Sequence, residues 1–443
     1  MTILIKNGQV INPATNMNQV ADVYIDGDKV VEIRENIERQ AERVIDATGC
    51  YVMPGFIDLH VHFRDPGLVH KEDIYTGMAA AAHGGYTTVY AMPNTKPVAD
   101  KPDVIEYVNK KSKSVPQHIN VFQVGAITVG QKGEELADIE GMVKAGSPAI
   151  SEDGKSVMNA QIYRAAMQEA KRLNIPVLAH CEDINLVNGG VMNEDDKSEE
   201  LGLPGIANAV EDVIVARDIM LSHETGCKLH LCHCSTEASV IMIAGAKERG
   251  LQVSGEVCPH HFVLTSDDIK EQVPEVQAGI MISNEVDADT NYKMNPPLRK
   301  KQDVEALKNG LRDNIMDVIS TDHAPHTFEE KNTSMKSAPF GIVGLETAAC
   351  LTHDELVLGG YLTPMQMAEK MSYNPAKIMS LDKGDIQPGK IADIVIFDPN
   401  ETYVIDKNTF ASKGRNTPFH GKQVTGRVKC TICDGRVVFD GMA

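Results

Sequence analysis

The stretch His60-Val61-His62-Phe63-Arg64-Asp65-Pro66-Gly67 follows an apolar run over residues 51–59, and the interpretation of the chain begins there. The apolar run is typical of a buried strand that is entered through Pro54-Gly55. Because side chains alternate between the two faces of a strand, His60 and His62 point the same way and can reach one metal ion. Two histidines at this spacing also occur by chance, so the other residues of the chain must show whether these two bind a metal ion.

Seven further apolar runs alternate with stretches of helical periodicity. Examples of that periodicity are Ile162-Tyr163-Ala166-Met167-Ala170 and Val240-Ile243-Ala244-Lys247. Eight strands with intervening helices predict an α/β fold, a (β/α)8 TIM-type barrel over residues 54–375. The predicted strands are 56–62, 87–92, 119–124, 149–151, 177–180, 229–233, 253–257 and 318–322.

Both ends of the chain consist of short β-type runs and turns. Asp26-Gly27 and Asp434-Gly435, each between apolar runs, predict β-hairpins. Chain ends often lie close together, and isolated hairpins are unstable. We therefore expect residues 1–53 plus 376–443 to form one small, discontinuous, β-sandwich-like domain; the alternative is two unrelated flaps.

Composition narrows the possible functions. The chain has 443 residues, a net charge of −19 and nine cysteines. The acidic balance, without a concentrated basic surface, argues against nucleic acid as a partner. No apolar run is long enough to span a membrane, and the first residues lack the organisation of a signal peptide. An odd number of scattered cysteines suits reduced thiols, so we expect a cytoplasmic protein.

Residues of metal-ligand type stand at the carboxyl ends of five predicted strands, where the chemistry of such barrels gathers. Four histidines and two carboxylates form a nitrogen and oxygen set that suits zinc, manganese or a similar divalent ion in a catalytic site. Six ligands exceed the needs of one tetrahedral ion, which favours a pair of ions about 3.5 to 4 Å apart. The residues are His60, His62, Asp153, His180, His233 and Asp322.

Three cysteines adjoin these histidines. Strand alternation predicts that Cys181, Cys232 and Cys234 point away from the face used by His180 and His233, as packing residues. A metal-binding role for one of them is the alternative.

The chain resembles the amidohydrolase superfamily and, within it, the class I dihydroorotases. The resemblance spans nearly the whole chain, and residues 385–393 resemble the superfamily's return to its β domain. The most specific motifs are the His-x-His strand with its arginine and the Asp-His-Ala-Pro-His segment. The motifs are His60-Val-His-Phe-Arg-Asp-Pro-Gly67, Met92-Pro-Asn-Thr95, His180-Cys-Glu-Asp183, Asn295-Pro-Pro-Leu-Arg299, Thr321-Asp-His-Ala-Pro-His326 and Gly341-Ile-Val-Gly-Leu-Glu346.

The resemblance implies a zinc enzyme, with one or two ions per subunit, that interconverts N-carbamoyl-L-aspartate and L-dihydroorotate in pyrimidine (UMP) biosynthesis. It assigns His60, His62 and Asp322 to one metal and His180 and His233 to the other, with Asp153 shared between them. A hydroxide bridging the metals attacks the ring carbonyl, and Asp322 acts as general acid and base. The implied substrate-binding residues are His62, Arg64, Asn94, Asn295, His326, Phe340 and Gly341.

Several positions keep alternatives open. Many relatives bridge their metals with a carbamylated lysine, whereas this chain reads Ser151-Glu152-Asp153-Gly154-Lys155 there; Glu152 and Lys155 therefore compete with Asp153. Arg299 is interpreted as a structural clamp and His323 as a packing residue. His260 and His261 could also contact the metals. The polar stretch 327–338 could close over bound substrate.

Arg64 decides between the related activities. A guanidinium forms two parallel hydrogen bonds with a carboxylate, which L-dihydroorotate carries and a hydantoin ring lacks. The alternatives are a hydantoinase or allantoinase, a metal-dependent deaminase, and a barrel that has lost catalysis and serves as a scaffold. The resemblance further implies a homodimer.

Overall fold

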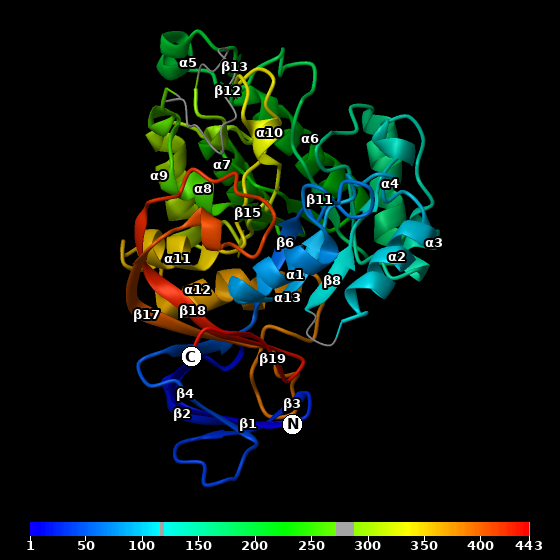
Figure 1. Cartoon of the computed structure of the whole chain (residues 1–443). Helices are drawn as coiled ribbons and strands as arrows, with labels where there is room; N and C mark the ends of the chain where they lie inside the picture. The colour runs from blue at the N-terminus through cyan, green and yellow to red at the C-terminus, as the bar shows by residue number, and fades with distance from the viewer. Residues whose placement is uncertain (116–118, 272–287, 443) are drawn as a thin grey trace.

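The computed structural model describes residues 1–115, 119–271 and 288–442 and has two parts (Figure 1). Parallel strands surrounded by helices form the upper part in this view. The lower part is rich in strands and contains both chain termini. The predicted α/β architecture, a barrel with a small β-rich region built from both termini, is confirmed.

In the part of the chain that the structure describes, eight parallel strand positions close into the barrel. The third consists of β8 and β9, separated only by Val124, which pair with β7 and β10 respectively. A parallel bridge between Val61 and His323 joins the last position to the first. All eight predicted strands are present, most of them shorter than expected. They are β6 (Phe56–Val61), β7 (Tyr86–Ala91), β8 (Asn120–Gln123), β9 (Gly125–Ala126), β10 (Ile150–Ser151), β11 (Val177–Ala179), β14 (Leu229–Leu231), β15 (Val253–Val257) and β16 (Val318–Ile319).

The helices follow the predicted periodicity. In α4, the Asn159 side chain caps the first turn by accepting the Gln161 N–H, and Tyr163, Met167 and Ala170 are buried. The main helices are α1 (Ile74–His83), α2 (Pro102–Ser112), α3 (Ile139–Lys144), α4 (Ala160–Leu173), α6 (Ala209–Thr225), α7 (Glu237–Glu248), α8 (Pro259–Val263), α9 (Lys301–Arg312), α10 (Phe328–Lys331), α11 (Ala348–Thr352), α12 (Pro364–Ala368) and α13 (Asn374–Ile378). The connection between β11 and α6 contains β12 (Met192–Asn193), α5 (Asp196–Leu201) and β13 (Gly205–Ile206).

One sheet unites the two ends of the chain. Its strand order is β19-β18-β17-β5-β1-β2-β3, with β4 beside β1. Because β17 pairs with β5, the alternative of two unrelated flaps is wrong. Both hairpins predicted from Asp-Gly turns are present. The exact domain boundaries stay a prediction. The strands are β1 (Thr2–Asn12), β2 (Met17–Asp26), β3 (Lys29–Arg34), β4 (Arg43–Asp46), β5 (Tyr51–Pro54), β17 (Ile394–Val404), β18 (Gln423–Cys433) and β19 (Arg436–Asp440).

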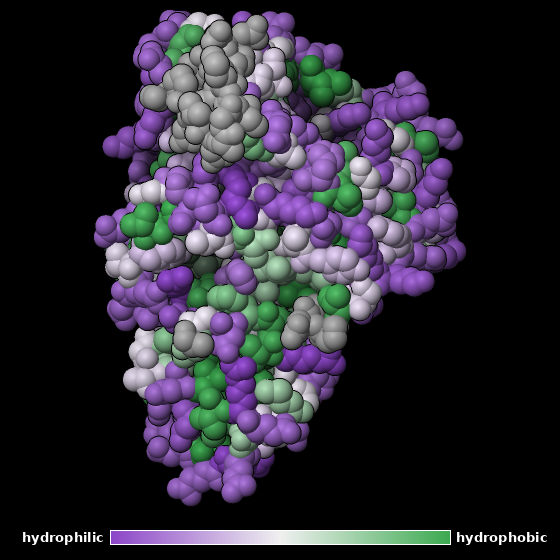
Figure 2. Space-filling model, in the orientation of Figure 1, coloured by the Kyte–Doolittle hydropathy of each residue, from purple (hydrophilic) through white to green (hydrophobic). Residues whose placement is uncertain are grey.

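The face seen in Figure 2 is mostly hydrophilic over the barrel, whereas hydrophobic side chains gather over the lower, sheet-bearing part. The sheet exposes Val20, Val31 and Val44. Among the described residues, none of the helices combines the length and the apolar character that a membrane crossing requires.

Candidate active site

The six predicted metal ligands lie together at the carboxyl ends of the barrel strands. Asp153 is at the centre: its carboxylate oxygens are 3.1 Å from His60 Nε2, 3.4 Å from His62 Nε2 and 3.4 Å from His180 Nδ1. The Nδ1 atom of His180 is 2.9 Å from Nε2 of His233, and Nε2 of His62 is 3.0 Å from an Asp322 oxygen. The structure thus brings all six side chains into one cluster.

Backbone conformation at two strand ends helps to aim these side chains. His60 belongs to β6, and His62 follows it directly. His233 and Asp322 adopt positive φ angles of 33° and 47°, in the left-handed region that residues other than glycine seldom occupy. The turn at each of these residues breaks the strand alternation and directs the side chain into the cluster.

The cluster fits metal ions. The Nε2 atom of His60 is fully buried and, among the described residues, has no hydrogen-bond partner of acceptable geometry. Ligand atoms of His60, His62 and Asp322 all lie within 4.8 Å of one another, as do those of His60, Asp153 and His233. Imidazole nitrogens and carboxylate oxygens in this arrangement suit a divalent ion.

Without metal, protons would have to supply the positive charge. Burial by itself raises the pKa of Asp153, but the histidines around it, His60 first, hold that pKa well below its usual range. Burial opposes protonation of His60, yet Asp153 raises the pKa of His60 well above its usual value. A bound cation satisfies both groups without these shifts.

Two carboxylates that the sequence did not single out orient the ligands. Glu256 accepts the His60 Nδ1–H at 3.1 Å and the His233 backbone N–H at 3.2 Å, and its other oxygen lies 3.0 Å from His230 Nε2. Because Nδ1 of His60 is bonded to Glu256, its Nε2 faces the cluster. Carboxylates outside the ligand set orient histidine ligands in metal sites in the same way. The signal available in the sequence was an acidic residue inside a buried strand, since a buried charge requires partners.

Glu182 is the second such carboxylate. It lies 3.0 Å from His180 Nε2 and accepts a hydrogen bond of 2.9 Å from the Asn295 side-chain amide. It therefore connects a metal ligand to a predicted substrate-binding residue.

A cavity of about 180 Å³ opens over the metal cluster. Every residue predicted to bind substrate lines it together with the metal ligands Asp153, His180, His233 and Asp322. These predicted residues are His62, Arg64, Asn94, Asn295, His326, Phe340 and Gly341.

Arg64 forms part of the cavity wall. Its side chain is buried, its backbone has a φ of 59°, and its Nε donates to the Pro325 carbonyl at 3.3 Å. One guanidinium nitrogen lies 3.4 Å from His326 Nε2. Asn94 contacts a predicted metal ligand as well, because its Oδ1 accepts a hydrogen bond of 2.8 Å from His62 Nδ1.

The competitors for the bridging position lie elsewhere. Glu152 accepts the backbone N–H groups of Ile127 and Thr128 at 3.0 Å each. The Lys155 ammonium donates to the Gln131 carbonyl at 3.2 Å. Asp153 is therefore the carboxylate that faces the histidines.

Of the remaining polar candidates, Arg299, His323 and His261 form hydrogen bonds within the protein, whereas the buried Nε2 atom of His260 has no partner among the described residues. Arg299 donates to the Asn193 side chain and the Ile206 carbonyl, as expected of a structural clamp. His323 accepts the Gly344 N–H at 3.2 Å. His261 donates to the Pro296 carbonyl at 2.9 Å, and its ring centre is 4.3 Å from that of His260. Neither His260 nor His261 lines the cavity over the cluster.

All three cysteines pack in buried hydrophobic clusters as expected, but the expected direction of Cys232 is wrong. Ligand atoms of Cys232, His60 and Glu256 lie within 4.8 Å of one another, so the Cys232 thiol lies beside His60. The physical reason is the positive φ of His233, which allows both neighbouring side chains to point inward. Burial raises the pKa of the Cys232 thiol, which opposes thiolate formation.

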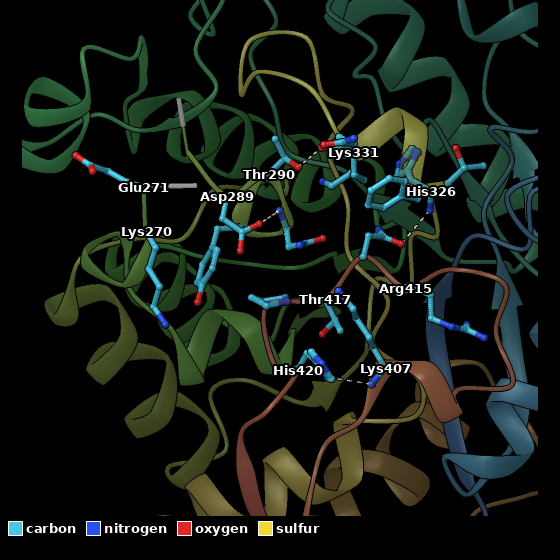
Figure 3. Close-up of a pocket in the computed structure, with 17 residues that line it drawn as sticks. Lys270, Glu271, Asp289, Thr290, His326, Lys331, Lys407, Arg415, Thr417 and His420 are labelled. Carbon is cyan, nitrogen blue, oxygen red and sulfur yellow. Dashed lines mark hydrogen bonds between the residues drawn. The ribbon is translucent and has the colours of Figure 1, made fainter. Parts of the chain in front are cut away.

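A second cavity, of about 420 Å³, lies on the other side of His326 (Figure 3). Its lining includes Lys331, Lys407 and Thr417, and it contains no member of the metal cluster. The smaller cavity is therefore the one that holds the predicted site residues.

Comparisons with known proteins agree with this geometry. Residues 49–239 match the family described as dihydro-orotase-like, and residues 342–439 match the amidohydrolase family. A dihydroorotase from Pelotomaculum thermopropionicum is 47% identical over 99% of this chain and 98% of that protein. A dihydroorotase from Acetivibrio thermocellus is 45% identical over 98% of each chain.

Solved structures provide a second comparison. The D-hydantoinase from Bacillus sp. AR9 aligns with a TM-score of 0.83 and 28% identity, over 99% of this chain and 95% of that one. The dihydropyrimidinase from Brevibacillus agri NCHU1002 aligns with a TM-score of 0.83 and 26% identity, over 100% and 95%.

Fold and site together define a metal-dependent amidohydrolase that acts on cyclic amides. The whole-chain identity to curated relatives narrows the class. The chain belongs to the dihydroorotase family.

Proposed function

We propose that the chain interconverts N-carbamoyl-L-aspartate and L-dihydroorotate, a step of pyrimidine biosynthesis. The observation that carries this assignment is Arg64, a buried guanidinium in the wall of the cavity over the metal cluster. The chain has a net charge of −19, so a buried arginine at this point is a specific device for an anionic substrate. A neutral ring carries no carboxylate for this guanidinium to bind.

We assign zinc to the cluster, with one or two ions per subunit. His60, His62 and Asp322 would hold one ion, and His180 and His233 the other, with Asp153 shared. When bound, such ions supply a nucleophilic hydroxide near neutral pH and polarise the carbonyl that it attacks.

Asp322 is assigned the proton transfer. Burial alone would raise its pKa, but His62 and the other histidines hold the pKa below the usual range, so the group is ionised at neutral pH. It can accept the proton of the attacking water and pass it to the ring nitrogen as the amide bond breaks. In the biosynthetic direction the same carboxylate returns that proton.

The cavity wall orients the substrate in this proposal. Arg64 meets the substrate carboxylate with two parallel hydrogen bonds, and Asn94, Asn295 and His326 contribute polar contacts. The backbone at Phe340 and Gly341 closes the wall. A β-carbon at Gly341 would come within 2.7 Å of the Ala324 β-carbon, so glycine is required there.

We also infer that residues 327–338 close over the substrate. In this structure the segment is fastened by the buried Lys293 ammonium, which donates to the Ala338 carbonyl at 2.6 Å, and it contains the buried Met335. Ligand should make this segment more resistant to protease. Equal cleavage rates with and without L-dihydroorotate would contradict closure.

We expect a homodimer in the cytoplasm. Light scattering of the purified protein tests the dimer, and a monomer at micromolar concentration would contradict it. Cell fractionation with detection of the chain tests the location.

The proposed reaction is tested by assaying one preparation with L-dihydroorotate, hydantoin and allantoin, alongside metal analysis of the same sample. We expect turnover of L-dihydroorotate and one to two equivalents of zinc. Turnover of hydantoin or allantoin alone would identify a different cyclic amidase. A metal-free, inactive preparation that zinc does not activate would favour a scaffold.

A further inference from the structure

The segment between β17 and β18 leaves the terminal sheet and rises along the barrel toward α8 and α10 (Figure 1). We call residues 405–422 the excursion. Glu72 fastens it to the barrel by accepting the Lys413 backbone N–H at 3.3 Å, and Glu346 does so by accepting the Ala411 N–H at 2.9 Å. The excursion thus reaches the barrel mouth although it is far from the cavity residues in sequence.

Asn416 is the point at which the excursion meets the substrate cavity. Its side chain is 3% exposed. The Oδ1 atom accepts the His326 backbone N–H at 3.1 Å, a contact seen as the dashed line at His326 in Figure 3. The Nδ2 group donates to the Ala324 and Gly341 carbonyls, both at 3.0 Å.

These bonds use both donors of the amide and its acceptor. The backbone of Asn416 adds another contact, since its carbonyl accepts the Val343 N–H at 2.9 Å. Gly414 permits the close approach, because a β-carbon there would lie 2.6 Å from a Val343 methyl and 2.8 Å from Pro325. A single side chain therefore joins the segment after β16 to the Gly341 segment.

The joined segments carry the substrate-binding wall. Ala324, His326 and Gly341 all line the cavity over the metal cluster. His326 also contacts Phe340, the residue before Gly341, since its Nε2 lies 2.9 Å from the Phe340 carbonyl oxygen. A carboxylate, a hydroxyl or an aliphatic side chain at 416 could not donate two hydrogen bonds and accept a third in the same place.

We propose that Asn416 is a positioning residue for substrate recognition: it sets His326 and Gly341 relative to each other and so defines the wall that faces the metal cluster. This inference rests on the proposed function, because it assumes that the wall binds the substrate. The hydrogen bonds that the Asn416 side chain forms with the described residues reach none of the six predicted metal ligands, so we expect it to act on substrate affinity rather than on metal binding.

The test compares Asn416→Ala and Asn416→Asp with wild type. The aspartate variant keeps the shape and the acceptor for the His326 N–H, but it loses both donors. Asn408→Ala is the matched control, since Asn408 lies exposed in the same excursion and bonds Asp406 in its own turn. KM, kcat, zinc content and the thermal midpoint are measured for all four proteins.

We expect KM for L-dihydroorotate to rise at least about tenfold in both Asn416 variants, with kcat within about threefold of wild type, because small displacements of positioning groups weaken productive binding. Zinc content and the control should equal wild type. An unchanged KM would overturn the inference. Parallel loss of zinc and kcat, or failure of both variants to fold, would also overturn it by showing a general structural role.

The same experiment separates this inference from the proposed function. The wild type is first assayed with L-dihydroorotate and hydantoin. If it accepts only hydantoin, the proposed substrate is wrong. The KM values of the Asn416 variants and of wild type are then compared on hydantoin, with the same expected and contradicting results.

Discussion

The metal cluster and the substrate-binding wall face each other across one cavity, but they are built in different ways. The metal ligands come from the ends of parallel strands, whose pairing fixes their spacing. The wall comes from segments after the strands, and hydrogen bonds such as those of Asn416 hold it together. We therefore propose that the barrel provides reactivity that related enzymes can share, whereas the wall provides the choice of substrate.

The largest expected effect comes from Asp322, which we propose serves both the metal and the proton transfer. Asp322→Asn should lower kcat by roughly 10³- to 10⁴-fold, in line with the loss of a general acid and base. KM should stay within about threefold, because the wall is intact. Steady-state kinetics of both reaction directions provide the measurement.

Asp313→Asn is the matched control, since Asp313 is exposed at the end of α9 and pairs with Arg312. It should behave as wild type. Near-normal turnover by the Asp322 variant would remove that residue from the mechanism.

The next largest effect tests the substrate-binding wall alone. Arg64→Met should lower kcat/KM for L-dihydroorotate about 10²- to 10⁴-fold, because two hydrogen bonds between charged groups contribute about 1.5 to 3 kcal/mol each. Zinc content should not change, and Arg64→Lys should recover part of the loss. If the methionine variant kept wild-type kcat/KM, Arg64 would have no role in recognition.

A smaller effect isolates the cluster. Glu256→Gln should weaken zinc binding about 10- to 100-fold, because the orienting partner of His60 loses its charge. Competition with a chromogenic chelator measures the affinity. Glu248→Gln, at the exposed end of α7, is the control. Equal affinities of the two variants would show that Glu256 does not support the metal.

The smallest effect concerns the metal-free protein. Burial opposes protonation of His180, but Asp153 and Glu182 raise its pKa to about 10. The unfolded value is about 6.5, so the folded state binds the proton more tightly. The stability that this proton contributes is present in full below about pH 6.5 and is lost as the pH rises toward 10.

Urea unfolding of chelator-treated protein at pH 6.5 and 9.5 measures this loss. Other groups also change the stability over this pH range: burial lowers the pKa of Lys331 to about 7, so its contribution to stability grows as the pH rises. Subtracting the unfolding free energies of the His180→Asn variant from those of wild type leaves the contribution of His180. We expect the wild-type advantage to shrink at pH 9.5. An advantage that grows with pH would contradict the account.

The same contrast explains what the sequence could predict. Strand alternation and position at strand ends are local properties, so His60, His62 and the other ligands were predictable from spacing. Alternation failed at Cys232, because the backbone turns at His233. Glu256 was missed since its partner His60 is 196 residues away. Asn416 gave no signal either, because its bonds reach residues 75 to 92 positions away.

An experimental structure of the zinc-loaded protein with L-dihydroorotate, with anomalous data at the zinc edge, tests the central claim most directly. We predict zinc held by His60, His62 and Asp322 and by His180 and His233, with the substrate carboxylate on Arg64. A substrate carboxylate turned toward the metals, or zinc bound away from Asp153, would contradict the division between cluster and wall.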